Sequence, residues 1–266
     1  MLKLDAYQLK WIAITGMVLN HAVIALREVI PLWLQFPMFA AGGVTFPILA
    51  YLIAEGYKHT SSVKKYLGRI LIFGLIAQPF HILVFRTFIV NIMFTIALGI
   101  CMLLLYGKLK IRWLFWIIFA VAAILTVLFD WGIIGIIMLL MFHVISKESK
   151  RRTLPVIVAG AYTLIVSLAS AVYFAILAAN PETQAIAYEL LASKGMDMSF
   201  VWVSVVFPVG IFLAIWLLRA YSGQRGKPTN KYLFYIAYPL HLVVLGGIAF
   251  ALGLVDLGTF SAAFGL

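Results

Sequence analysis

Nine long apolar runs constrain this chain more than any other feature of its sequence. They cover residues 8–26, 37–55, 67–86, 89–107, 111–129, 131–146, 154–179, 199–219 and 232–254. Most of them approach the ~20 residues that an α-helix needs to cross the ~30 Å hydrocarbon core of a bilayer. Lipid offers no hydrogen-bond partner to a peptide group, so such runs span a membrane as helices. The pattern predicts an all-α integral membrane protein with about nine transmembrane helices.

Composition supports this class and excludes others. The 266 residues are 65% hydrophobic and 11% charged, whereas soluble domains are roughly 45–50% apolar. The net charge of +11 does not indicate a nucleic-acid partner, because Lys and Arg lie in short clusters between the apolar runs and not along one basic face. No composition shift or linker divides the chain, so we expect residues 1–266 to form a single polytopic transmembrane domain.

The positions of the basic residues predict the orientation. With nine crossings, one side of the membrane collects 17 of the 20 Lys and Arg residues; the other side keeps Arg27, Arg86 and Lys194 and the acidic loop 180–199. Cytoplasmic loops carry the excess of Lys and Arg. We therefore expect a cytoplasmic N-terminus and an extracytoplasmic C-terminus. The first run is followed by no small-residue cleavage site, so we expect it to remain as the first helix.

Histidines inside the apolar runs are the first candidates for function. An ionisable residue near the centre of a membrane helix costs roughly 2.5–3.5 kcal/mol on insertion scales, and His21, His81 and His241 stand in such positions. Lys10 and His21 are eleven residues apart, which is close to three helical turns and a rise of ~16 Å. Both therefore project from one face, with His21 near mid-membrane. Burial keeps such an imidazole neutral and able to accept a proton, although a packing role remains the alternative.

A second cluster lies at the cytoplasmic end of the second predicted helix. Glu55 and His59 share a face there if the helix continues, and Lys65 and Arg69 follow at the start of the third helix. Arg and Lys hold phosphates through charge-assisted hydrogen bonds and point charge. The cluster predicts a site for an anionic, nucleotide-like ligand that docks from the cytoplasm. Ordinary membrane anchoring is the alternative for Lys65.

Further polar residues lie deeper in the predicted bundle. Asn91 belongs to the fourth run, and Tyr238, Pro239 and His241 interrupt the ninth. Pro239 frees a backbone carbonyl that a cavity or a neighbouring helix must satisfy.

Two other groups have simpler interpretations. His81 is expected mainly to pack against a neighbouring helix. Asp130, between the fifth and sixth runs, most simply caps a helix, with orientation of a substrate amine as the alternative. No metal-ligand spacing is present in the sequence, so no metal is expected.

The chain resembles the TraX family of pilin N-acetylase-like membrane proteins. The likeness is carried by the run GVTFPILAYLIAEGYKHT at 43–60, by KYLGR at 65–69, by NIMFT at 91–95, by DWG at 130–132 and by FYIAYPLHL at 234–242. A more distant similarity joins Leu4, Asp5, Lys10 and His21 to the first helix of membrane acyltransferase family 3, in which a basic residue precedes the catalytic histidine by this interval.

The resemblance implies transfer of an acetyl or other acyl group in the cell inner membrane. Acetyl-CoA would be the cytoplasmic donor, and an amine or hydroxyl, such as a pilin N-terminus or an envelope glycan, would be the acceptor. In that scheme His21 is the catalytic base, Lys10, Lys65 and Arg69 face the CoA phosphates, and Glu55, His59, Asn91, Tyr238 and His241 form the rest of the substrate cavity. Relatives often carry an acidic residue where this chain has Asn20, so the orientation of His21 must come from another group.

Two other function classes fit the same sequence. A transporter or flippase would use the buried histidines to bind or relay protons, and broken helices in two matching halves would favour it. A noncatalytic envelope or pilus assembly factor would need only small-residue helix interfaces that hold a partner in the bilayer.

Overall fold

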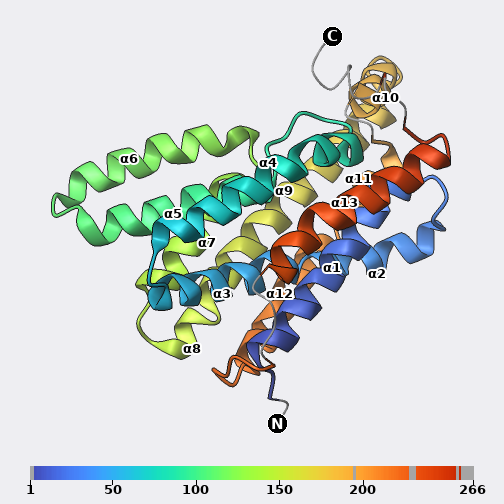
Figure 1. Ribbon diagram of the computed structural model, residues 1–266. Coiled ribbons are helices and arrows are strands. Elements are labelled where there is room, and N and C mark those ends of the chain that lie inside the picture. The colour runs from blue at the N-terminus through green and yellow to red at the C-terminus, as the bar shows by residue number, and fades with distance from the viewer. Residues whose placement is uncertain (1–2, 194–195, 228–231, 256–257, 259–266) are drawn as a thin grey trace.

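The computed structural model describes residues 3–193, 196–227, 232–255 and 258. Within this part the chain is helical and contains no named strand. Figure 1 shows α1 (Ala6–Leu26), α2 (Leu32–Gly42), α3 (Thr45–His59), α4 (Val63–Phe85), α5 (Ile92–Lys108), α6 (Arg112–Leu125), the 3₁₀ turn η1 (Thr126–Leu128), α7 (Gly132–Val144), α8 (Glu148–Arg151), α9 (Leu154–Ala179), α10 (Gln184–Ser193), α11 (Met198–Ser204), α12 (Phe207–Arg219) and α13 (Leu233–Ala251).

Polar residues between the apolar runs start several of these helices. Asp5 accepts a hydrogen bond from the Gln8 backbone, and the Gln8 side chain in turn accepts one from the Asp5 backbone, which makes a capping box at the start of α1. The Asn91 side chain accepts from the Met93 backbone at the start of α5. Such caps satisfy backbone N–H groups that have no partner within the helix. They fix where these helices begin.

The predicted all-α class is confirmed, and the helices have the length and apolarity of membrane spans. Six of them are long and apolar enough to cross a bilayer: Ala6–Leu26, Leu32–His59, Val63–Phe85, Glu148–Ala179, Met198–Arg219 and Leu233–Ala251. The other three predicted runs correspond to shorter apolar helices, Ile92–Lys108, Arg112–Leu128 and Gly132–Val144. The predicted number of nine crossings therefore rests on these three shorter helices in addition to the six long ones.

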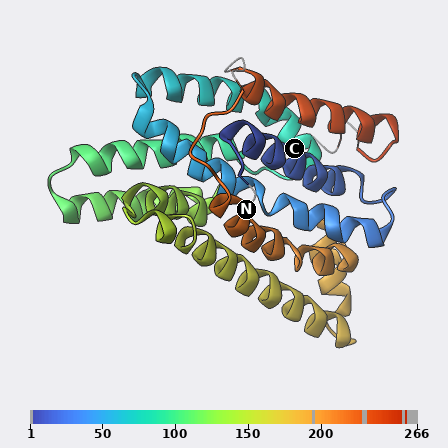
Figure 2. The ribbon, with the colours of Figure 1, turned by 90° about the horizontal axis from the view of Figure 1, so that it is seen from below.

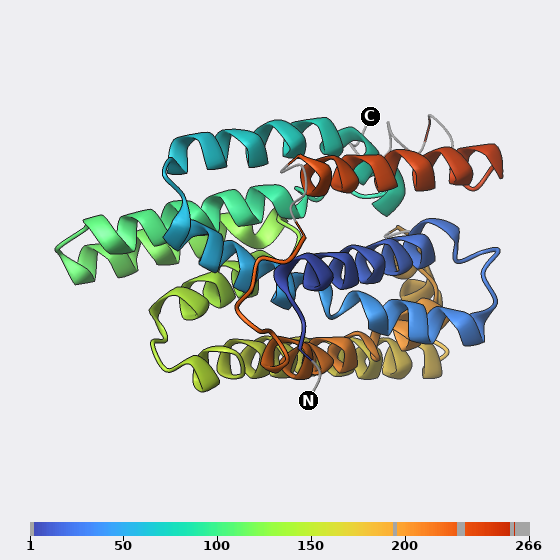
Figure 3. The same cartoon turned by 60° about the horizontal axis from the view of Figure 1, so that its bottom comes forward.

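The helices run roughly side by side in a bundle. Helix α13 packs against α4 and α1, and α1 packs against α2 and α3. On the other side α12 packs against α9 and α2, while α7 packs against α3 and α5. Figures 2 and 3 show α1 in the middle of this arrangement, between α13 and α12. The α5–α6 hairpin projects beyond the rest of the bundle, and α8 and α10 lie at opposite ends (Figure 1).

A break between α2 and α3 allows two backbones to touch. The second predicted run is one segment of 28 residues, Leu32–His59, and it is interrupted at Gly43 and Val44. A Cβ atom at Gly43 would collide with the Phe207 carbonyl, and one at Gly210 in α12 would collide with the Ala40 carbonyl. Small residues permit this close approach of membrane helices. The contact fixes α12 against the helix pair that forms one wall of the site.

We expect Gly210→Ala to lower the stability of the bundle, because the added methyl group overlaps the Ala40 carbonyl, which belongs to a helix backbone and cannot rotate away. Overpacking of this kind costs on the order of 1–3 kcal/mol. The thermal unfolding midpoint of the detergent-solubilised protein would measure it. Gly247→Ala in α13 is the control, because a Cβ atom there meets nothing within 4 Å. Equal midpoints for both variants would contradict the contact.

Candidate functional site

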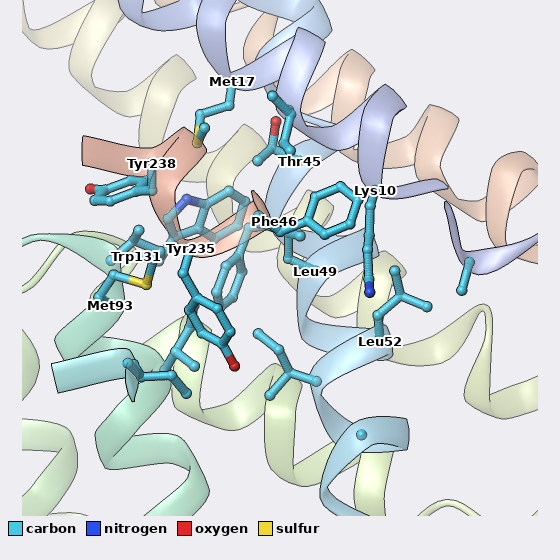
Figure 4. Close-up of a pocket in the computed structure, with 18 of the residues that line it drawn as sticks. Lys10, Met17, Thr45, Phe46, Leu49, Leu52, Met93, Trp131, Tyr235 and Tyr238 are labelled. Atoms are coloured by element: carbon cyan, nitrogen blue, oxygen red, sulfur yellow. The ribbon is translucent and has the colours of Figure 1, made fainter. Parts of the chain in front are cut away.

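A cavity of about 1030 Å³ lies inside the bundle. Its walls come from α1, α2, α3, α4, α5 and α13 and from Phe207 at the start of α12, together with the turn at 130–131 and the loop 221–227. Figure 4 shows Lys10 on one side of this space and Tyr235 and Tyr238 on the other, with Phe46 and Trp131 between them. The apolar residues Met17, Leu49 and Met93 cover much of the remaining wall. A long ligand with one polar end and an apolar middle fits such a space.

His21 lies on the wall of this cavity, and its ring is bonded to a residue that does not line the cavity. Its Nδ1 atom is 2.7 Å from Nε2 of His241, although the two residues are 220 positions apart in the chain. The Nδ1 atom of His241 lies 3.0 Å from the Ala237 carbonyl oxygen. The Phe85 ring meets the His21 ring edge to face, with 5.1 Å between centroids. The structure thus brings together the two histidines that the sequence marked separately.

Four basic side chains gather at the other end of the cavity. They are Lys10, Arg69, Arg225 and Lys227. The Lys10 ammonium lies 4.7 Å from the centroid of the Phe234 ring. The Arg69 guanidinium lies near the Tyr66 and Tyr235 rings, and its Nε atom is buried with no hydrogen-bond partner among the described residues. Positive charges and an unsatisfied donor make this end suitable for phosphate groups.

The segment that leads into the loop with Arg225 and Lys227 is hydrogen-bonded to the residues that precede α1. The Leu4 backbone donates to the Ala220 carbonyl at 2.9 Å and accepts from the Ser222 backbone at 2.8 Å. Gly226 has a φ of 76°, and a Cβ atom there would meet the Asp5 carboxyl group. In the sequence, Arg225 and Lys227 indicate only the orientation of the chain in the membrane. Their place beside Lys10 depends on pairing between segments about 220 residues apart, which no local pattern reveals.

Glu55 and His59 both line the cavity, but Glu55 is already engaged by other charges. Arg151 is 4% exposed and donates to the Glu55 carboxylate and to Glu148 at 3.2 Å. Lys58 lies 3.4 Å from Glu55 on its more exposed side. Glu55 therefore joins α3 to α8 and leaves the positive charge at this end of the cavity largely uncompensated.

Two other predicted site residues lie away from the cavity wall. Lys65 is exposed, and only its backbone N–H is bonded, to the Ser62 hydroxyl that caps α4. Asn91 is fully buried, and its amide donates to the Gly74 carbonyl and to the Gln78 side chain, both at 2.8 Å. Asn91 thus links α4 to α5 in addition to capping α5. The structure does not bring Lys65 and Asn91 to the other candidates.

The turn between α6 and α7 supplies residues whose role the sequence did not define. The interpretation of Asp130 as a helix cap is wrong, because Trp131 is the N-cap of α7, with a φ of 62° and no side-chain cap. The turn is held by its backbone: the Asp130 N–H donates to the Val90 carbonyl at 2.8 Å, and the Thr95 hydroxyl donates to the Asp130 carbonyl at 2.6 Å. Asp130 lines the cavity, and burial raises the pKa of its carboxyl group to about 6.

Tyr238 and His81 complete the surroundings of the histidine pair. Tyr238 lines the cavity as predicted; it is 3% exposed, and its hydroxyl has no hydrogen-bond partner within the described chain. His81 is fully buried and stacks on the Phe85 ring with 4.1 Å between centroids. This position agrees with a packing role for His81.

We expect Arg151→Leu to destabilise the protein strongly. The change removes the buried cation that Glu55 and Glu148 share, and because both carboxylates are partly exposed the cost should lie below the roughly 3–5 kcal/mol of a fully buried ion pair. Lys58→Leu removes only the more exposed partner of Glu55 and should cost well under half as much. Urea or thermal unfolding in detergent would compare the two. A smaller effect for Arg151→Leu than for Lys58→Leu would contradict this structural role.

Comparison with known proteins agrees with the family resemblance. Residues 5–249 match the family described as TraX protein, and this range contains every residue of the cavity wall. A relative from Dichelobacter nodosus, the probable fimbrial assembly protein FimC of serogroup H1, is 30% identical over 260 residues, which cover 91% of this chain and 94% of the relative. No solved structure matches the chain. This protein belongs to the TraX family.

Proposed function

We propose that this protein is a membrane-embedded acyltransferase that moves an acetyl or similar acyl group from cytoplasmic acetyl-CoA to an extracytoplasmic amine or hydroxyl. The acceptor is a pilin N-terminus or an envelope glycan. One observation carries the proposal: a single cavity has four cations at one end and the imidazole of His21 on its wall. Phosphate binding and base catalysis are the two tasks that a CoA-dependent transferase must combine.

The topology that we propose supplies donor and acceptor from opposite sides. The chain crosses the cell inner membrane nine times, with its N-terminus in the cytoplasm and its C-terminus outside. The concentration of Lys and Arg at the ends of α1, α3, α8 and α12 supports this orientation. At the other end of the bundle, Asp197 pairs with Arg27 at 3.7 Å, and Glu28 pairs with Arg86 at 3.0 Å.

The basic end of the cavity suits the donor. Lys10, Arg69, Arg225 and Lys227 would hold the phosphates of CoA, and the unsatisfied Nε atom of Arg69 supplies a donor for one of them. The apolar wall formed by Phe46, Leu49 and Met17 then guides the uncharged arm toward His21. Lys10 and His21 are separated by about 16 Å along α1, so the donor must enter in an extended form.

His21 is the general base in this proposal. Its Nε2 atom takes the proton from the acceptor nitrogen or oxygen, which attacks the thioester carbonyl carbon. A new bond from that atom to the acyl carbon forms, and the bond from carbon to sulfur breaks. The protonated His21 then returns the proton to the departing thiolate. Asp130, on the same cavity wall, is placed to attract an acceptor amine.

A noncatalytic role in pilus assembly is the second candidate. The name of the Dichelobacter relative describes a fimbrial assembly protein, and membership of the same family extends that link to this chain. An assembly factor, however, has no need for a cavity with a basic end. Binding of CoA distinguishes the two candidates.

We expect His21→Ala to reduce acyl transfer by roughly 10²–10⁴-fold, the usual contribution of a positioned general base, while the protein still inserts into membranes. Transfer from radiolabelled acetyl-CoA to a peptide amine or a glycan in nanodiscs would measure the loss. His143→Ala is the control, because His143 lies near the end of α7 and outside the cavity wall. Full activity of the His21 variant, or no transfer and no CoA binding by the wild type, would contradict the proposal.

Arg69→Gln should weaken CoA binding about 10- to 100-fold, because a hydrogen bond to a charged group contributes about 1.5–3 kcal/mol. The matched control is Lys65→Gln, which removes the same charge one helical turn earlier on α4 but outside the cavity. Calorimetry with CoA would give both dissociation constants. If the Lys65 variant loses as much affinity as the Arg69 variant, the phosphates bind elsewhere.

A further inference from the structure

Two short contacts in the membrane interior determine where the protons of two histidines lie. One joins Nδ1 of His21 to Nε2 of His241 at 2.7 Å. The other joins Nδ1 of His241 to the carbonyl oxygen of Ala237 at 3.0 Å. A neutral imidazole has one N–H donor and one nitrogen acceptor, so each ring can present a proton on only one side.

The carbonyl oxygen sets the direction of the whole chain of hydrogen bonds. It can only accept, so Nδ1 of His241 must carry the proton. Nε2 of His241 is then an acceptor, and the contact of 2.7 Å requires that Nδ1 of His21 be the donor. Nε2 of His21 is left without a proton. His21 lies on the cavity wall, whereas His241 lies behind it, so the unprotonated nitrogen is the one available to a ligand.

We propose that His241 is the positioning residue of this site: with the Ala237 carbonyl it fixes His21 in the Nδ1–H tautomer and keeps Nε2 free as the proton acceptor. This assignment rests on the proposed function for its effect on catalysis, but the tautomer itself can be measured without any activity. His241 does not contact the reacting atoms. It acts through His21.

The neighbouring Asn20 does not perform this task. Its amide donates to the Phe39 carbonyl on α2 at 3.4 Å, whereas the side-chain hydrogen bond of His21 within the described chain goes to His241. His241 on α13 therefore orients the His21 ring, as a carboxylate beside the histidine would do. A neutral histidine in this role has a physical advantage, because it holds the base without placing a permanent negative charge in the bilayer interior.

The geometry of α13 keeps His241 in place. Ala237 precedes His241 by one helical turn, so the ring bonds to a carbonyl on its own helix. The Phe85 ring lies against His21 from α4, and α4 packs along α13. Both rings are therefore restrained, and the hydrogen bond between them sets which nitrogen of His21 faces the cavity.

Nitrogen-15 NMR of histidine-labelled protein in nanodiscs tests the tautomers directly. In the wild type we expect a protonated Nδ1 and an unprotonated Nε2 at His21, with the resonances assigned by loss of signal in His21→Ala. In His241→Leu the fixed tautomer should be lost, so that His21 shows a mixture or the reverse form. His241→Gln places an amide oxygen near the position of Nε2 and should restore the wild-type pattern.

The same variants separate positioning from packing in the transfer assay. His241→Leu should lower kcat by roughly 10- to 100-fold, a part of the contribution of the base, and should leave KM for acetyl-CoA unchanged. His241→Gln should recover most of the rate. Equal unfolding midpoints for both variants would show that the difference is not a loss of folding.

Three results would overturn the inference: a proton on Nε2 of His21 in the wild type, an unchanged His21 tautomer in His241→Leu, or, where the wild type transfers acyl groups, equal rates for the Leu and Gln variants. The expected tautomers in a protein that transfers no acyl group would support the positioning geometry and refute the proposed function. The two ideas can therefore fail separately.

Discussion

The bilayer offers no hydrogen-bond partners to a polar group, and the arrangement of polar residues in this protein follows from that constraint. Most polar side chains inside the bundle find partners within it: Asn91 bonds to α4, Arg151 to two carboxylates, and His21 to His241. The polar atoms that remain unsatisfied on the cavity wall, Nε of Arg69 and the hydroxyl of Tyr238, belong to opposite ends of one space. Both of these groups are therefore available to a ligand in the cavity.

The sequence predicted the helices well because their length and apolarity are local properties. It did not predict the break at Gly43, since the two glycines there are explained by contacts distant in sequence: Gly42 faces Asn20 of α1, and Gly43 faces Phe207 and Gly210 of α12. His21 was found from its depth on α1, and Lys10 from its spacing. Arg225 and Lys227 were overlooked as site residues because positive charge in a loop also serves topology, and their position depends on a backbone pairing with Leu4. Asp130 was misread because a left-handed turn at Trp131 moves the cap one residue further.

Glu55 shows why a charged residue near a site need not belong to its chemistry. Its place at the end of α3 suggested a ligand contact, and it does line the cavity. The Arg151 guanidinium, however, forms an ion pair with the Glu55 carboxylate and also donates to the Phe142 carbonyl. The pair joins α3, α7 and α8 at the end of the bundle where the four cations gather. By neutralising Glu55, Arg151 leaves the field at the mouth of the cavity positive, which favours an anionic ligand without contacting it.

Helix α1 carries both ends of the site, with Lys10 at the mouth and His21 three turns further in. Backbone hydrogen bonds also join its first residues to the loop that bears Arg225 and Lys227. A helix of this length behaves as a stiff rod, so a displacement at the entrance is passed along its axis to the imidazole. Because one continuous helix carries both residues, the spacing between the basic mouth and the imidazole is set by α1 alone.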